Sequence, residues 1–146
     1  MAITQAIANS FKKELLEGEH DFTQTTGDKF KLALYTAGAT LTSATTSYTT
    51  TGEVAASGQY TAGGGALVNG TVSITAGVAR ADFANLSFTG VTLTARGALI
   101  YNTSATVANA AVAVLDFGGD KSATSGTFTI QFPNPTSTAA ILRISG

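Results

Sequence analysis

The stretch Thr127-Phe128-Thr129-Ile130-Gln131-Phe132 alternates strictly between polar and apolar side chains. Successive side chains of an extended strand point to opposite faces, so the three apolar side chains share one face and the three polar ones share the other. A sheet made of such strands covers a core on one side only, which is typical of antiparallel sheets. The pattern therefore favours an antiparallel β fold.

Working outward, the same alternation recurs in Lys29-Phe30-Lys31-Leu32-Ala33-Leu34-Tyr35, which predicts a second half-buried strand. The dipeptide Asn69-Gly70 separates 66–68 from 71–74 and predicts a two-residue hairpin turn in which Leu67 faces Val72. About eight strands are expected in all, which predicts a mainly β chain folded as an antiparallel β-sandwich or jelly roll. The remaining predicted strands are 78–84, 91–94, 98–102, 111–117 and 139–145.

One α-helix is expected at the N-terminus. Apolar side chains recur every four residues, Thr4 can cap the start, and Gly18 stands where a helix would end. We therefore expect a helix over 4–17, an N-terminal helical segment over 1–18, and a single β-sandwich domain over 19–146. The apolar stripe either closes one end of the sandwich or packs on another subunit, and we favour the second. The predicted interface residues are Ile3, Ile7, Phe11 and Leu15, together with Tyr48.

Tyr48 lies in a Thr-rich stretch near 37–60 that contains few bulky apolar side chains. We expect a long surface loop there, and loops of this length in compact domains are often functional.

Composition excludes several classes of partner. Charged residues make up 12% of the 146 residues and the net charge is −1, so we expect neither nucleic acid nor a membrane surface as a partner. There is no cysteine, hence no disulfide framework and no thiolate metal site. No apolar run is long enough to span a membrane. The first lysine is Lys12, so the pattern of a secretory signal peptide is absent and we expect the chain to stay where it is made.

The sequence also lacks the groups of residues that are typical of catalytic or metal sites. The single histidine, His20, is expected to be solvated after the end of the helix. The run Asp116-Phe117-Gly118-Gly119-Asp120 is interpreted as a strand ending in a glycine turn, with at most a weak cation site. Gly63-Gly64-Gly65 lacks the lysine of a phosphate-binding loop, and no serine has the context of a hydrolase nucleophile. We therefore expect no enzymatic activity, cofactor or metal. The four tyrosines are scattered along the chain, so no aromatic platform for sugars is expected.

Five segments carry a resemblance to a known family. The most specific are Gly27-Asp28-Lys29-Phe30-Lys31-Leu32-Ala33-Leu34-Tyr35-Thr36 and Ala95-Arg96-Gly97-Ala98-Leu99-Ile100-Tyr101-Asn102. The others are Ser10-Phe11-Lys12-Lys13-Glu14-Leu15-Leu16, Tyr60-Thr61-Ala62-Gly63-Gly64 and Ala113-Val114-Leu115-Asp116-Phe117-Gly118. Together, and in order over nearly the whole chain, they resemble small virion proteins of tailed bacteriophages and prophages, of the capsid cement or decoration type.

The resemblance implies a non-enzymatic protein that binds and stabilises the phage head shell. Its expected partners are the major capsid protein and other copies of itself, a trimer being slightly favoured over a dimer. The expected location is the capsid exterior, after synthesis in the host cytoplasm. Two alternatives stay open, a structural module of the tail or fibre and a small carbohydrate-binding β-sandwich.

Overall fold

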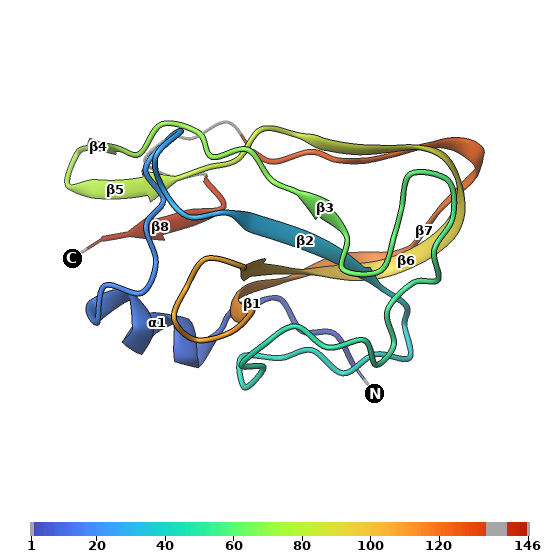
Figure 1. Cartoon of the computed structure of the whole chain (residues 1–146), viewed down its shortest axis with the longest axis horizontal. Coiled ribbons are helices and arrows are strands. Elements are labelled where there is room, and N and C mark those ends of the chain that lie inside the picture. The colour runs from blue at the N-terminus through green and yellow to red at the C-terminus, as the bar shows by residue number, and fades with distance from the viewer. Residues whose placement is uncertain (1, 134–139, 146) are drawn as a thin grey trace.

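The computed structural model describes residues 2–133 and 140–145. It is mainly β, with two antiparallel sheets and one short helix near the N-terminus, as predicted (Figure 1). The larger sheet has the order β1-β7-β6-β2-β3 and the smaller one β4-β5-β8. The elements are β1 (Ala6–Ile7), α1 (Asn9–Leu16), β2 (Phe30–Tyr35), β3 (Gly65–Ala66), β4 (Ser73–Thr75), β5 (Val78–Ala81), β6 (Leu86–Asn102), β7 (Ala110–Ile130) and β8 (Leu142–Ile144).

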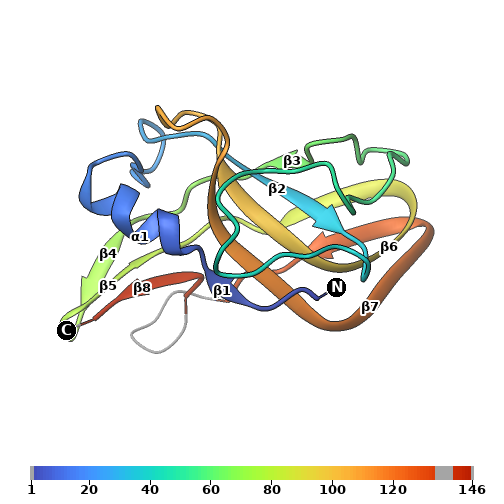
Figure 2. The same ribbon diagram turned by 90° about the horizontal axis from the view of Figure 1, so that it is seen from below.

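The dominant element is one long hairpin formed by β6 and β7, paired from Leu86↔Ile130 to Asn102↔Ala110. The sequence predicted separate shorter strands here, because polar residues and glycines interrupt the alternation. In the structure these interruptions are register shifts inside continuous strands. At the end of the molecule away from α1 both strands of the hairpin bend, so the outer half of the hairpin runs back over its inner half (Figures 1 and 2). The rings of Phe117 and Phe128, both on β7, consequently lie 6.2 Å apart.

Burial at the end of β7 and in the two residues after it confirms the alternation from which the fold is predicted. Phe128, Ile130 and Phe132 are buried, while Thr127, Thr129 and Gln131 are exposed. One face of this part of the chain therefore covers the core, and the other face is exposed to solvent.

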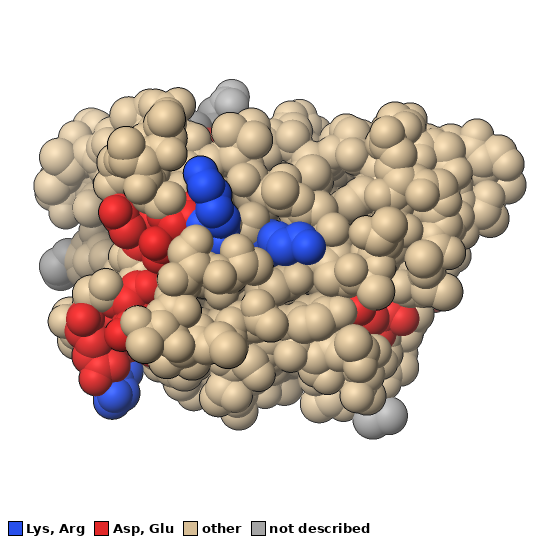
Figure 3. All heavy atoms as spheres, in the orientation of Figure 1, with Lys and Arg blue, Asp and Glu red and all other residues tan. Residues whose placement is uncertain are grey.

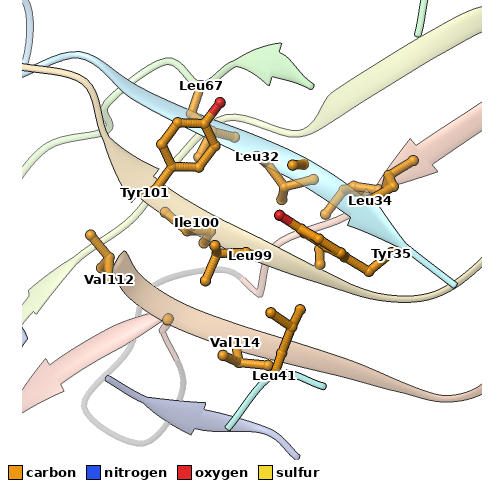
Figure 4. Close-up of a cluster of buried hydrophobic side chains, with 14 of the residues drawn as sticks. Leu32, Leu34, Tyr35, Leu41, Leu67, Leu99, Ile100, Tyr101, Val112 and Val114 are labelled. Carbon is orange, nitrogen blue, oxygen red and sulfur yellow. The ribbon is translucent and has the colours of Figure 1, made fainter. Parts of the chain in front are cut away.

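Strand β2 is more deeply buried than the predicted half-buried strand. Ala33 and Tyr35 are fully buried although they alternate with Leu32 and Leu34, because the loop that follows β2 covers this second face. Figure 4 shows side chains of β2 beside those of β6 and β7 in the core. The labelled residues are Leu32, Leu34, Tyr35, Leu41, Leu67, Leu99, Ile100, Tyr101, Val112 and Val114.

The predicted hairpin at Asn69-Gly70 is wrong. The Asn69 side chain donates hydrogen bonds to the carbonyl oxygens of Thr23 and Asp28, and its backbone bridges to Phe83. The tight turn lies further along, where Ala76 and Gly77 both have positive φ between β4 and β5, as a type I′ turn requires. Asn69 is thus used to hold two chain segments together instead of reversing the chain.

The N-terminal helix is shorter than predicted. Residues Ala6–Ile7 form β1, which pairs with β7, and α1 spans only Asn9–Leu16. Residues four apart share a face in a strand as well as in a helix, so the spacing from Ile3 to Ile7 could not distinguish the two. The C-terminal end was predicted well, since Glu17 is the C-cap and Gly18 follows with φ of 78°.

The predicted strand 139–145 starts outside the described residues, and its later part is β8. The segment near 37–60, expected as a long surface loop, contains no named strand, but Ala39, Leu41, Val54 and Tyr60 within it are buried.

Substitution of Gly64 tests the packing of β2. Gly64 has φ of 82°, and a Cβ there would overlap the carbonyl oxygen of Leu32. We expect Gly64→Ala to lower the free energy of unfolding by about 2 to 5 kcal/mol, through backbone strain and overpacking. Gly119→Ala is the control, because a Cβ at Gly119 meets nothing within 4 Å. Equal stability of the two variants in urea titrations would contradict the described packing.

Candidate interaction surface

The predicted interface residues do not form one exposed stripe. Ile3 and Phe11 are buried in the chain's own core, at 7% and 4% exposure. Ile7 and Leu15 are partly buried against that core. For Ile3 and Phe11 the structure therefore corresponds to the alternative in which the stripe closes one end of the sandwich. Tyr48 is also partly buried, in a cluster described below.

A groove of about 720 Å³ separates α1 from the smaller sheet. The helix side contributes apolar side chains of Phe11, Leu15 and Leu16, and Phe22 follows close by in the chain. The sheet side contributes apolar side chains from β5 and β8, together with Val72, which directly precedes β4. The apolar lining residues on this side are Val72, Ala79, Ala81, Leu142 and Ile144.

Strand register explains the apolar sheet wall. Ile74 pairs with Ala79, which pairs with Ile144, so these three side chains form one row on one face. Ala81 and Leu142 form the next row on that face. The sequence contained this signal as apolar residues two apart, Val72 with Ile74 and Leu142 with Ile144. It could not be used because the strand partners of these residues were unknown.

Exposed apolar side chains concentrate at this groove. In the described part of the chain, large apolar residues are exposed at six positions, and four of them belong to the groove or its sheet face. These four are Leu16 (91% exposed), Ile74 (69%), Ile144 (59%) and Val72 (48%). Such a concentration marks a surface that is suited to contact with another macromolecule.

The floor of the groove contains His20, which is fully buried instead of solvated as predicted. Its ring lies 4.7 Å from that of Phe11 and also neighbours Phe22 and Phe30. The prediction failed because the chain turns back after Gly18 and inserts His20 beneath α1.

Hydrogen bonds assign a neutral form to His20. Asn102 Oδ1 accepts from the backbone N–H groups of Ser104 and Ala105, so the amide nitrogen of Asn102 faces the imidazole. That nitrogen lies 3.0 Å from His20 Nδ1, which must accept. Nε2 then carries the proton and donates to Glu14 Oε1 at 3.0 Å.

Asn102 extends this arrangement into a network across three segments. Its amide nitrogen also donates to Asp28 Oδ2 at 2.7 Å, while Glu14 belongs to α1 and Asn102 ends β6. The network fixes α1, and hence one wall of the groove, to the body of the sandwich. Its role is structural, because each polar group in it is already satisfied by another.

The long loop is anchored by a second polar cluster around Glu53. Its carboxylate accepts hydrogen bonds from the hydroxyls of Tyr48 (2.6 Å) and Tyr60 (2.7 Å) and from the backbone N–H of Gly63 (2.8 Å). The Tyr101 hydroxyl donates to the Gly63 carbonyl, and its ring stacks on that of Tyr48 at 4.8 Å.

Tyr35 completes this cluster by donating to the carbonyl of Thr49 at 2.6 Å. All four tyrosines, which look scattered in the sequence, therefore meet in one place. Every Phe and Tyr within residues 2–133 and 140–145 is at least partly buried, so these rings form no open platform for a sugar. Chain positions alone could not indicate this, since the cluster depends on the loop folding back over β2.

The Asp116–Asp120 run is not a strand end. It lies inside β7, where Asp116 accepts a hydrogen bond from the backbone N–H of Gly118 at 2.9 Å and one from Arg96 Nε at 3.3 Å. The Gly118 bond is the main cause that lowers the pKa of the Asp116 carboxyl. The carboxylate thus stabilises a bulge, and the cation interpretation gains no support from its contacts.

A second groove, of about 820 Å³, lies between the first half of β7 and its last residues, 127–130. It borders Pro133 and Ala140, which flank residues outside the described part, so we assign it no function.

Alkaline titration tests the tyrosine cluster. Burial raises the pKa of all four phenols, Glu53 raises it further, and the pKa of Tyr101 reaches about 12. An unfolded tyrosine ionises near pH 10, so the folded state holds these protons more tightly. Stability is therefore complete below about pH 10 and falls as the pH rises toward 12. We expect phenolate absorbance to rise and the circular dichroism signal to fall over the same pH range. Ionisation near pH 10 in folded protein would contradict the cluster.

Replacement of Asn102 tests the network beneath the groove. Asn102→Leu keeps a similar volume but leaves His20, Asp28 and two backbone N–H groups without their partner. We expect a loss of about 2 to 4 kcal/mol in the free energy of unfolding, measured with urea. The exposed Asn9→Ala serves as control and should change it by less than about 0.5 kcal/mol. A similarly small change for Asn102→Leu would contradict a stabilising role for this network.

Neither the described structure nor comparison with known proteins identifies a reaction or a ligand for this chain. Within residues 2–133 and 140–145, no three His, Cys, Asp or Glu side chains gather as a metal site would require. No helix in that part is long and apolar enough to cross a membrane. Comparison of the chain with protein families, curated proteins and solved structures finds no match.

Proposed function

We propose that the chain is a non-enzymatic structural virion protein, a cement or decoration protein that binds and stabilises the head shell of a tailed bacteriophage. The observation that carries this proposal is the gathering of exposed apolar side chains along one groove, in a fold whose titratable clusters are occupied by structural hydrogen bonds. A surface of this kind is suited to assembly with other protein subunits. The sequence resemblance to phage virion proteins supplies the kind of assembly.

The distribution of charge supports attachment through uncharged contacts. On the face seen in Figure 3, charged side chains gather toward the end that carries α1, and most of the remaining surface has none. Hydroxyl groups line the exposed face of the β6–β7 hairpin and pair across it, Ser87 with Thr129 and Thr94 with Ser122. Such neutral surfaces can contact a shell through packing and hydrogen bonds. The proposed partner is the major capsid protein, and the proposed location is the capsid exterior.

The number of copies per particle tests this function. Purified virions of the phage or prophage that encodes the chain are digested and quantified by mass spectrometry against the major capsid protein. Hundreds of copies per particle are expected of a shell protein. A handful would assign the chain to the tail or fibre, and its absence from particles would overturn a virion role.

Salt provides a second test, of the attachment itself. Because screening by salt weakens charge pairs and hardly affects apolar packing or neutral hydrogen bonds, the protein should stay on particles in about molar salt. Attachment is measured by sedimenting particles and quantifying the chain in the pellet. Release that rises steadily with ionic strength would contradict the proposed contact and would direct attention to residues 1–31, which hold 9 of the 17 charged side chains.

A further inference from the structure

The two ends of α1 are attached to the sandwich in different ways. Before the helix the attachment is backbone pairing, in which β1 pairs with β7. After the helix it is made by side chains, because His20 contacts Asn102 at 3.0 Å and Glu19 Oε2 accepts from the Thr106 N–H at 3.0 Å. Histidine is the side chain that ordinarily gains a proton between about pH 8 and 5. The attachment after α1 therefore contains a group that responds to pH near neutrality.

The contact between His20 and Asn102 fits only a neutral imidazole. Nδ1 accepts from the Asn102 amide nitrogen, so a proton on Nδ1 would set two donors against each other at 3.0 Å. Rotation of the amide does not relieve this, because the Asn102 oxygen accepts from the backbone N–H groups of Ser104 (2.7 Å) and Ala105 (3.1 Å). The imidazole is fully buried, so water does not replace the lost bond while the contact stays closed. Proton uptake therefore breaks this contact.

The second contact of the imidazole responds in the opposite way. Nε2 donates to Glu14 Oε1 at 3.0 Å, and a charged imidazole turns this hydrogen bond into an ion pair between two side chains that are almost removed from water. Glu14 and His20 are six positions apart in one segment, whereas His20 and Asn102 are 82 positions apart. A proton on His20 thus strengthens the bond within the N-terminal segment and removes the bond that joins this segment to β6.

The charged groups around His20 favour the open arrangement once the imidazole is charged. Acidic side chains gather at the α1 end of the face seen in Figure 3. The two charged groups that the network joins to the imidazole, Glu14 directly and Asp28 through Asn102, are both carboxylates, so counter-charges for a charged His20 are already in place. The charged side chains of the neighbouring elements are Lys12 and Glu14 on α1, Glu19, Asp21 and Asp28 before β2, and Arg80 and Arg143 on the smaller sheet.

We propose that His20 is an acid-sensitive latch for α1. With a neutral imidazole, the contact with Asn102 closes the C-terminal end of the helix onto the last residue of β6. With a charged imidazole this contact opens, Glu14 and His20 move together away from Asn102, and α1 pivots about the pairing of β1 with β7. Because α1 forms one wall of the groove, the latch changes the width of the groove. The proposal concerns the chain alone and does not rest on the proposed function.

The protonation state of the latch is measured on the wild-type chain. Because the chain has one histidine, labelling with ¹⁵N-histidine gives the NMR signals of a single imidazole, which are followed from about pH 7.5 to 5. At the upper end we expect a neutral ring with its proton on Nε2. A proton on Nδ1, or a charged ring, in the folded protein at that pH would overturn the proposal. This titration needs no variant, so it decides the proposal independently of how any variant folds.

His20→Gln separates a latch from a merely structural contact. Glutamine has an acceptor for the Asn102 amide and a donor for Glu14, so it reproduces both bonds of the neutral histidine but gains no proton. The folded wild type holds His20 neutral while the unfolded chain takes up the proton, so wild-type stability falls as the pH falls. Between about pH 7.5 and 5.5 we expect the wild-type Tm to drop at least about 3 °C further than that of His20→Gln. Equal drops, which titration of carboxylates alone would give, would overturn the proposal.

Movement of the helix is measured as the distance between two spin labels. Because the chain has no cysteine, Leu16→Cys and Val107→Cys together give one label at the end of α1 and one in the connection between β6 and β7. Both side chains are exposed, at 91% and 43%. We expect the distance to lengthen by several ångströms as the pH falls over the same range, and to stay constant when His20→Gln is added. A constant distance in the chain that retains His20, or an equal change in both chains, would contradict the latch.

Discussion

The pairing of β6 with β7 is the constraint on which the rest of the structure depends. Its inner part, from Gly97 to Asn102 against Ala110 to Asp116, supplies the middle of the larger sheet, and β1 and β2 add to its two sides. Its outer part curls back and brings Phe88 and Phe128 over the same core. Among the described elements, β6 and β7 form the most extensive contact. Such a topology requires distant pairing and is expected to fold more slowly than a helical protein of equal length.

Polar residues inside the fold serve mainly to attach what lies outside the hairpin. Glu53 draws three donors to itself and so holds the long loop against β2. Asn102 performs the corresponding task at the other end, where it joins His20 and Asp28. A buried polar group that is fully satisfied costs little and specifies one arrangement, whereas an unsatisfied one is costly. The two clusters therefore give a chain rich in small residues a defined shape, and they explain why its few titratable groups are engaged.

Local patterns in the sequence predicted the antiparallel β class, but they misplaced the limits of several strands and their connections. The alternation at Phe128, Ile130 and Phe132 was sufficient for the antiparallel fold, because successive side chains of any strand point to opposite faces. The turn at Asn69-Gly70 was misplaced, because the Asn69 side chain binds carbonyl groups that lie more than forty positions away. The burial of His20 and the meeting of four tyrosines likewise arise from tertiary contacts that no local pattern encodes. For the same reason the groove was not foreseen, although Leu16, Val72 and Ile144 are plain in the sequence.

The central claim is that this protein acts through contact at the groove between α1 and the smaller sheet. Hydrogen–deuterium exchange of the full chain, free and bound to purified phage heads, tests it most directly, because exchange reports where contacts form. We expect slower exchange in the bound chain in 12–16, 72–75 and 142–144. Exchange that is the same in the free and the bound chain, or protection confined to the loop near 37–60, would contradict the proposed contact.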